Sequence, residues 1–238
     1  MDIHLKRLRA RFEISAEEEA FIRALPDRTE TYRADQTAVR TGQPLTHSTV
    51  LLEGVMARHR DLSSGTRQVT EIHVPGDFTD LHGFTLKRLD HDVVALSACK
   101  VALIPHERLW RMMEEQPRLT RIYWFGTNLD AAVHREWVVS MGRRQGMARM
   151  AHLFCEMYIR LGLVGLVDGG RYELPLSQLE LGECLGMTAV HANRTLQQLR
   201  DSGTVEFREG TVSVCDFQAL ADIADFRPDY LYLKPPPL

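Results

Sequence analysis

The sequence predicts an α+β protein built of three consecutive parts: a β-rich region over 1–116, a long helix and hinge over 117–145, and a helical region with a hairpin over 146–238. Three observations predict this order. Short β-prone segments recur at roughly ten-residue spacing in the first part, separated by glycine or polar turns. A helical pattern then follows Pro117, and two short helices and a hairpin occupy the last part.

The β-rich region is expected to form a sandwich or barrel. Its clearest strands lie at 49–52, 69–74 and 93–96, and a Pro-Gly-Asp turn lies at 75–77. A short helix is expected before this region, because Ser15 is a typical N-cap and Glu18, three residues later, completes a capping box.

The helix that starts at Pro117 is expected to run to about Arg143, since proline is favoured in the first turn of a helix. Apolar side chains recur along it at three- and four-residue steps, and such a seam usually needs a partner helix. A homodimer is the simplest source of that partner, although a helix packed only on its own barrel is the alternative. The residues expected to form the dimer interface are Ile122, Phe125, Leu129, Val133 and Trp137.

Composition alone does not point to a nucleic-acid partner. The net charge is −3, and residues 147–238 contain 8 Lys and Arg against 12 Asp and Glu. Neither an apolar signal-peptide core nor a run long enough for a membrane span occurs, so a cytoplasmic protein is expected. Four widely separated cysteines without a C-x-x-C pair argue against a zinc site or a disulfide framework, and no metal or cofactor is expected.

The most informative segment runs from 176 to 199 and has the pattern of a helix-turn-helix. Ser177 is placed to cap the first helix with Glu180 as the capping-box partner. Gly186 suits a turn that needs a positive φ, and Thr188 is placed to cap the second helix. The inward face of that second helix is expected to be apolar, and a hairpin over 205–214 is expected to follow as a wing.

The outward face of the second helix is expected to read DNA. No Asp or Glu occurs between Thr188 and Arg200, although this part of the chain is acidic as a whole. Arginine can bind guanine bidentately, asparagine can do the same for adenine, and small apolar groups contact the thymine methyl. The residues expected at the DNA interface, including a phosphate contact from the wing, are Ser177, Gln178, Thr188, Ala189, Val190, His191, Asn193, Arg194, Gln197 and Arg208.

With these parts in this order, the chain resembles the cyclic-AMP receptor/fumarate-nitrate regulator (Crp/Fnr) superfamily of bacterial transcription regulators. The resemblance is carried by segments 52–54, 75–78 and 99–104 and by Glu180 through Leu196. It implies a β-roll sensor domain of the cyclic-nucleotide-binding type, a dimerisation helix, and a C-terminal winged helix-turn-helix. The implied partners are double-stranded DNA, a second copy of the chain and RNA polymerase.

The ligand-binding motifs of that superfamily are not reproduced. Where cyclic-AMP-binding members hold the phosphate, this chain has Asp80-Leu81 and Leu89-Asp90, which lack the arginine that a phosphodiester needs. Iron–sulfur members use several N-terminal cysteines, whereas the first cysteine here is Cys99. We therefore expect a regulator that does not use cyclic AMP.

Three alternatives stay open. His82 follows the turn glycine at the spacing of the axial histidine in haem-containing members, so a haem or other small-ligand sensor is one of them, although a structural role for His82 is expected. A cupin-type barrel enzyme would use histidines of the β-rich region, yet no H-x-H pair occurs, and no enzymatic activity is expected. A ligand-binding module without DNA activity leaves the acid-free outward face unexplained.

Overall fold

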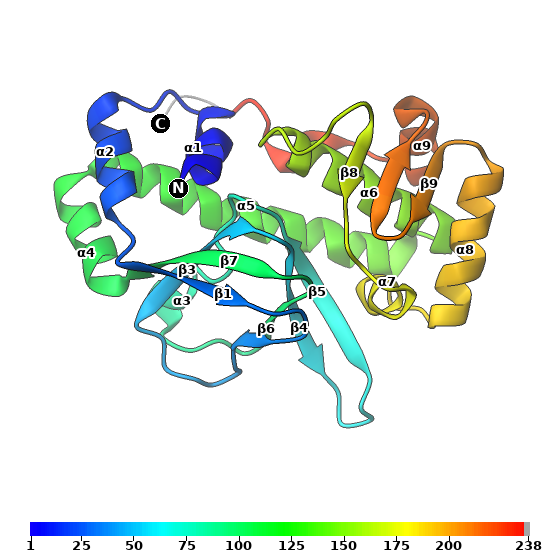
Figure 1. The fold of residues 1–238 in the computed structure, drawn as a ribbon, viewed down its shortest axis with the longest axis horizontal. Helices are drawn as coiled ribbons and strands as arrows, with labels where there is room; N and C mark the ends of the chain where they lie inside the picture. The colour runs from blue at the N-terminus through cyan, green and yellow to red at the C-terminus, as the bar shows by residue number, and fades with distance from the viewer. Residues whose placement is uncertain (236–238) are drawn as a thin grey trace. The chain divides into compact units, whose positions relative to one another are not determined.

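A computed structural model describes residues 1–235 of the chain and divides it into two compact units (Figure 1). The first unit comprises Met1–His59, Ile72–Ala132 and the described residues from Leu231 on. The second unit comprises Arg60–Glu71 and Val133–Tyr230.

Two antiparallel sheets form the β-roll of the first unit. The three-stranded sheet has the order β1-β7-β3, with β1 at Arg28–Tyr32, β3 at His47–Glu53 and β7 at Cys99–Pro105. The other sheet has the order β2-β6-β4-β5 and four strands: β2 (Thr37–Val39), β4 (Met56–Asp61), β5 (Arg67–His73) and β6 (Asp92–Ala95). The strands expected at 49–52, 69–74 and 93–96 are thus present within one or two residues of their expected bounds.

Helices pack on this β-roll and close its core. They are α1 (Asp2–Arg9), α2 (Ala16–Ala24), α3 (Gly83–Leu86), α4 (His106–Glu115) and the N-terminal part of α5 (Pro117–Arg143). Their buried apolar side chains join those of the strands in one cluster, which includes Leu5, Ile22, Ile104, Leu109 and Ile122. The expected capping box of Ser15 and Glu18 is present at the start of α2.

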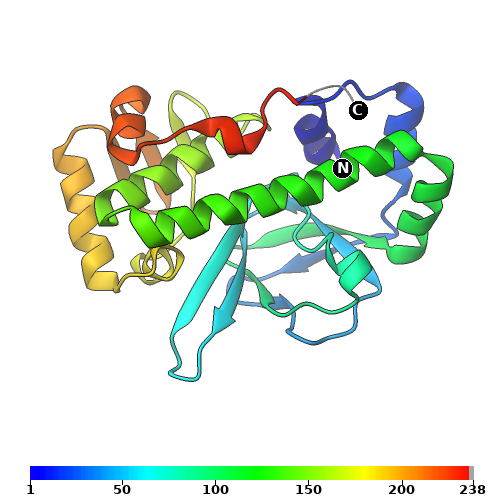
Figure 2. The same ribbon diagram turned by 180° about the vertical axis from the view of Figure 1, so that it is seen from behind.

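Helix α5 spans Pro117–Arg143 and is one unbroken helix of 27 residues (Figure 2). Its bounds agree with the prediction, because Pro117 occupies the first turn and the expected break follows Arg143. The next helix, α6, begins at Gly146 with Gln145 as its N-cap.

The second unit contains the helix-turn-helix and its wing. Helix α6 (Gly146–Gly162) packs against α8 and α9, and a three-stranded sheet of order β8-β10-β9 lies beside them. The remaining elements are β8 (Arg171–Glu173), α7 (Gln178–Leu185), α8 (Ala189–Asp201), β9 (Val205–Arg208), β10 (Thr211–Val214), α9 (Phe217–Ala224) and a short 3₁₀ helix (Pro228–Leu231). The sequence predicted α7, α8 and the hairpin, but not β8, whose three residues are too few to show a pattern.

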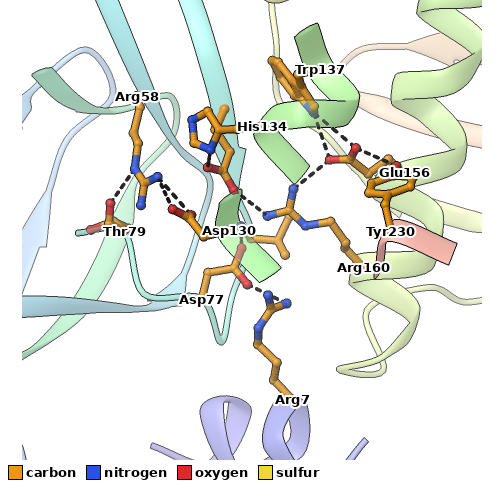
Figure 3. A network of polar contacts seen from close by, with 12 residues as sticks. Arg7, Arg58, Asp77, Thr79, Asp130, His134, Trp137, Glu156, Arg160 and Tyr230 are labelled. Atoms are coloured by element: carbon orange, nitrogen blue, oxygen red, sulfur yellow. Dashed lines mark hydrogen bonds and ion pairs between the residues drawn. The ribbon is translucent and has the colours of Figure 1, made fainter. Parts of the chain in front are cut away.

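A buried polar cluster ties the elements of the second unit together (Figure 3). The Glu156 carboxylate of α6 accepts hydrogen bonds from Trp137 Nε1 at 3.2 Å, Tyr230 Oη at 2.8 Å and Arg160 Nη1 at 2.8 Å. Glu156 is completely buried and Arg160 is 2% exposed. A buried carboxylate is tolerated when it is paired and fully hydrogen-bonded in this way.

Candidate nucleic-acid interface

Side chains cap both helices of the helix-turn-helix. Ser177 Oγ accepts a hydrogen bond from the Glu180 amide at 3.2 Å, and the Glu180 carboxylate accepts one from the Ser177 amide at 2.7 Å. Thr188 Oγ1 accepts a hydrogen bond from the His191 amide at 3.2 Å. Between the helices Gly186 has a φ of +60°, a conformation that glycine adopts without a steric penalty. These caps and this turn confirm the local structure expected from the sequence.

The inward faces of α7 and α8 form the core of the motif. Both faces are buried and mostly apolar, and they comprise Leu181, Cys184, Leu185, Ala192, Thr195, Leu196 and Leu199. Burial raises the pKa of the Cys184 thiol, which therefore stays protonated and packs as a small apolar group. This packing holds α8 at a defined angle to α7 and directs its other face to solvent.

The solvent-facing side of α8 carries the residues expected to read bases. Val190 is 82% exposed, and His191, Asn193, Arg194 and Gln197 are also exposed, whereas Ala189 is half-buried. Within residues 1–235 no hydrogen bond or ion pair engages the Arg194 guanidinium, so its five donors face solvent. We conclude that this side of α8 presents a free cation and small side chains, with no carboxylate until Asp201.

Asn193 is held in place by the preceding helix. Its Nδ2 donates to Gln178 Oε1 at 2.9 Å, which leaves its Oδ1 and its second amide hydrogen available. Gln197 is engaged differently, because its Nε2 donates to Asp201 Oδ1 at 2.7 Å and its Oε1 accepts from Arg200 Nη1 at 3.0 Å. The two amide side chains are therefore not equally free to contact a base.

An open groove of about 390 Å³ lies between the N-terminus of α7, the side of α8 and the wing. Arg208 lies in its wall, although its Nε is 3.4 Å from the Glu206 carboxylate in an exposed ion pair. The wing turns at Glu209 and Gly210, which both have positive φ. Arg200 also lines the groove, although it is not among the residues expected at the DNA interface. Its place seven residues after Asn193 on the same helical face is the signal that could have identified it.

The residues expected at a dimer interface are mostly buried within the single chain. Ile122, Leu129, Val133 and Trp137 are between 1% and 8% exposed, and Phe125 is half-buried against the core of the first unit. These side chains already have partners in their own protomer. The apolar seam that we expected to need a second chain is thus the face that α5 turns toward its own protomer.

A different face of α5 remains exposed along the whole helix. The residues of this face are all exposed, and the spacing between successive ones alternates between three and four positions. They are Arg121, Trp124, Asn128, Ala131, Arg135, Val138 and Gly142. Trp124 is 66% exposed and Val138 is 72% exposed. We call this set the outward ridge. The steps of three and four residues match the spacing of a coiled-coil seam.

In the first unit an arginine fills the interior between the sheet and α5 (Figure 3). Arg58 of β4 is 2% exposed; its Nε donates to the Thr79 carbonyl at 2.8 Å, and its Nη1 donates to both Asp130 carboxylate oxygens at 2.9 Å. The ion pair therefore joins β4 of the β-roll to α5.

Asp80 and His82 follow the Gly-Asp-Phe turn and both point toward structural partners. Asp80 is 1% exposed and accepts hydrogen bonds from the Thr49 amide and hydroxyl at 2.6 and 2.8 Å. Burial nevertheless raises the pKa of this carboxyl to about 6, against the hydrogen bonds from Thr49 and the charge of Arg58, which lower it. His82 Nδ1 lies 4.0 Å from the Asp130 carboxylate, and its ring lies 5.4 Å from that of His91.

The cysteines are reduced thiols in this structure. Burial raises the pKa of the Cys99 thiol and raises that of Cys155 to about 12, so both thiols are protonated at neutral pH. All four cysteines are free. Among residues 1–235, no helix combines the length and the apolar composition that a membrane span requires.

Two family models match the chain. Residues 29–116 match the cyclic nucleotide-binding domain, and residues 148–223 match the Crp-like helix-turn-helix domain. Among curated proteins, the nitrogen fixation regulation protein FixK of Bradyrhizobium diazoefficiens is 29% identical over 70% of this chain and 69% of its own length. The transcriptional activator protein FnrL of Cereibacter sphaeroides is 25% identical over 82% of this chain and 79% of its own length.

Solved structures agree on the fold. FixK2 from Bradyrhizobium japonicum superposes with a TM-score of 0.73 at 23% identity, covering 82% of this chain and 96% of that one. A CRP/FNR-family transcriptional regulator from Thermus thermophilus superposes with a TM-score of 0.64 at 16% identity, covering 84% of this chain and the whole of that one. With both domain models, these curated regulators and this fold in agreement, the chain belongs to the Crp/Fnr superfamily of DNA-binding transcription regulators and is not an enzyme.

Proposed function

We propose that the protein binds a pseudo-palindromic DNA site as a homodimer, with α8 of each protomer in the major groove. Arg194 binds a guanine edge, Asn193 contacts a neighbouring base while it is held by its bond to Gln178, and Ser177 and Thr188 contact phosphates. Arg208 of the wing contacts the backbone beside the groove. Two recognition helices related by a twofold axis need half-sites about one helical turn, about 34 Å, apart.

One observation carries the proposal: the exposed side of α8 is free of acids between Thr188 and Arg200 and bears an arginine without a partner in the described structure. An unpaired guanidinium on a capped helix is a preorganised donor for guanine O6 and N7. The domain is acidic overall, so the concentration of non-acidic side chains on this one face supports a specific role.

We place the dimer interface on the outward ridge of α5, in place of the buried residues expected from the sequence. Trp124, Ala131 and Val138 occupy one seam position of the repeat. The other seam position is occupied by the polar or small residues Arg121, Asn128, Arg135 and Gly142. A polar asparagine within such a seam is a known means of specifying register in two-stranded coiled coils.

We further propose that the sensor domain works without cyclic AMP. The Arg58 guanidinium is committed to Asp130 and the Thr79 carbonyl, and Asp80 and the buried Leu89 occupy the segment that would need to hold a phosphodiester. A carboxylate repels that group, and an apolar side chain offers it no hydrogen-bond donor. The remaining contact between Arg58 and α5 supplies a link between sensor and dimer helix that needs no ligand.

These assignments divide the chain into three functional parts. We propose residues 1–116 as sensor domain, 117–145 as dimerisation helix and hinge, and 146–238 as DNA-binding domain. As a regulator of transcription the protein would contact RNA polymerase and would act in the cytoplasm, where a bacterial chromosome lies.

Selection of bound sequences from a random DNA pool tests this function, because it reports binding, palindromy and half-site spacing together. Arg194→Ala should lose the preference for guanine and about 1–3 kcal/mol per half-site, with the fold unchanged. Leu166→Ala, which truncates an exposed side chain outside the helix-turn-helix, is the matched control. Recovery of the same consensus with equal affinity by Arg194→Ala would show that Arg194 reads no base.

A further inference from the structure

Val190 is the most exposed large apolar side chain among the described residues, at 82%. It lies in the first turn of α8, two residues after the Thr188 cap, on the side of the helix that faces away from the core. Exposed valine disfavours a helix and adds nothing to the packing of the motif. Its position on a recognition helix therefore calls for a contact outside the protein.

The neighbours of Val190 define what that contact is. Arg194 lies four residues later on the same face, one helical turn and about 6 Å further along the axis. Base pairs in B-DNA are stacked about 3.4 Å apart, so the two side chains face bases within about two steps of each other. Asn193, beside them, is restrained by Gln178 at 2.9 Å.

The chemistry of the side chain selects the base. Valine has no donor or acceptor, so it cannot recognise the polar edges of guanine, cytosine or adenine. The major groove presents one apolar group, the 5-methyl of thymine, which small apolar side chains contact. We propose that Val190 recognises a thymine methyl in each half-site, within about two base pairs of the guanine bound by Arg194. This inference rests on the proposed role of α8 in the major groove.

Replacement of thymine by deoxyuridine tests the contact, since it removes the methyl group and leaves every hydrogen bond of the base pair unchanged. Each thymine of the selected half-site is replaced in turn, and binding is measured by a fluorescence titration at fixed salt. One thymine close to the guanine should show a loss of about four-fold per half-site, the value of one buried methyl-sized group. The other thymines should show little change.

Variants assign that loss to Val190. Val190→Ala lacks both γ methyl groups and should lose most of the difference between the thymine and deoxyuridine sites, whereas Leu166→Ala should keep the wild-type difference. Val190→Glu should select cytosine at the same position, because a carboxylate accepts a hydrogen bond from cytosine N4. The inference would be overturned if Val190→Ala kept the full wild-type difference between thymine and deoxyuridine. It would also be overturned if the scan with the wild-type protein found no sensitive thymine. Failure of the wild type to select any site would instead overturn the proposed function itself.

Discussion

Asp80 is a buried acid whose charge is costly to the fold. Its pKa of about 6 lies above the ordinary value of 3.8, because burial penalises the carboxylate more than the Thr49 hydrogen bonds favour it. The folded protein therefore binds more protons than the unfolded chain between about pH 4 and pH 6. Through this residue, stability falls as the pH rises across that window and stays lowered above it.

Asp80→Asn should remove that pH dependence. The amide oxygen can still accept from the Thr49 backbone, and no charge is buried. We expect the variant to gain stability over the wild type as the pH rises from 4 to 6, reaching on the order of 2–3 kcal/mol at pH 7. Urea unfolding at several pH values measures the difference in the free energy of unfolding between the two proteins. This difference isolates Asp80, because every other titrating group is present in both proteins. A constant difference across the window would contradict the assignment.

His4 changes the stability with pH in the direction opposite to Asp80. The comparison of wild type with Asp80→Asn is needed because it cancels this effect of His4. Its ring is buried, Nδ1 donates to the Gly76 carbonyl at 2.8 Å, and burial lowers its pKa to about 4. The unfolded chain binds more protons here between about pH 4 and pH 6.5, so this residue lowers stability as the pH falls through that range.

At the scale of the element, the turn between α7 and α8 depends on close backbone packing. A Cβ on Gly182 would lie 2.5 Å from the carbonyl oxygen of Met187 and 3.4 Å from the amide nitrogen of Ala189. These atoms belong to the turn and to the start of the recognition helix. The close approach therefore sets the distance between α7 and α8.

Gly182→Ala should disrupt this turn. We expect a loss of about 1–3 kcal/mol from overpacking, together with weaker DNA binding because α8 must move. Gly162→Ala is the control, since its Cβ would meet no atom closer than 3.8 Å and alanine favours a helix. Thermal unfolding and a DNA titration on both variants measure the two effects. Unchanged DNA affinity in Gly182→Ala would mean that this contact does not position α8.

The whole molecule is expected to depend on pairing of the outward ridge. Val138→Asp places a charge at a seam position of α5 without entering the protomer core, because Val138 is 72% exposed. We expect a folded monomer at micromolar concentration, with reduced DNA affinity since one chain contacts one half-site. Val139→Asp, one residue away and 48% exposed, should weaken the dimer much less. Sedimentation that shows both variants dimeric would place the interface elsewhere.

The sensor domain should not respond to cyclic nucleotides. A ligand at one hundred times its Kd adds about 2.7 kcal/mol of stability, which raises the Tm of a domain of this size by about 5–10 °C. We expect no such shift with cyclic AMP or cyclic GMP at millimolar concentration. A clear rise in Tm with either would mean that Arg58 exchanges Asp130 for a phosphate.

The local structure of this protein follows from its sequence alone. Caps, turns and helix starts depend on side chains within a few residues of each other, as at Ser177 with Glu180, at Thr188 and at Gly186, so composition and spacing suffice to predict them. The tertiary structure decided which face of α5 is covered. Both of its faces carry apolar residues at helical spacing, and only packing against distant elements separates Ile122, which is buried, from Trp124, which is exposed. The pairing of Arg58 with Asp130 also depends on the tertiary structure. The two residues are seventy-two positions apart, so no local pattern in the sequence predicts their contact.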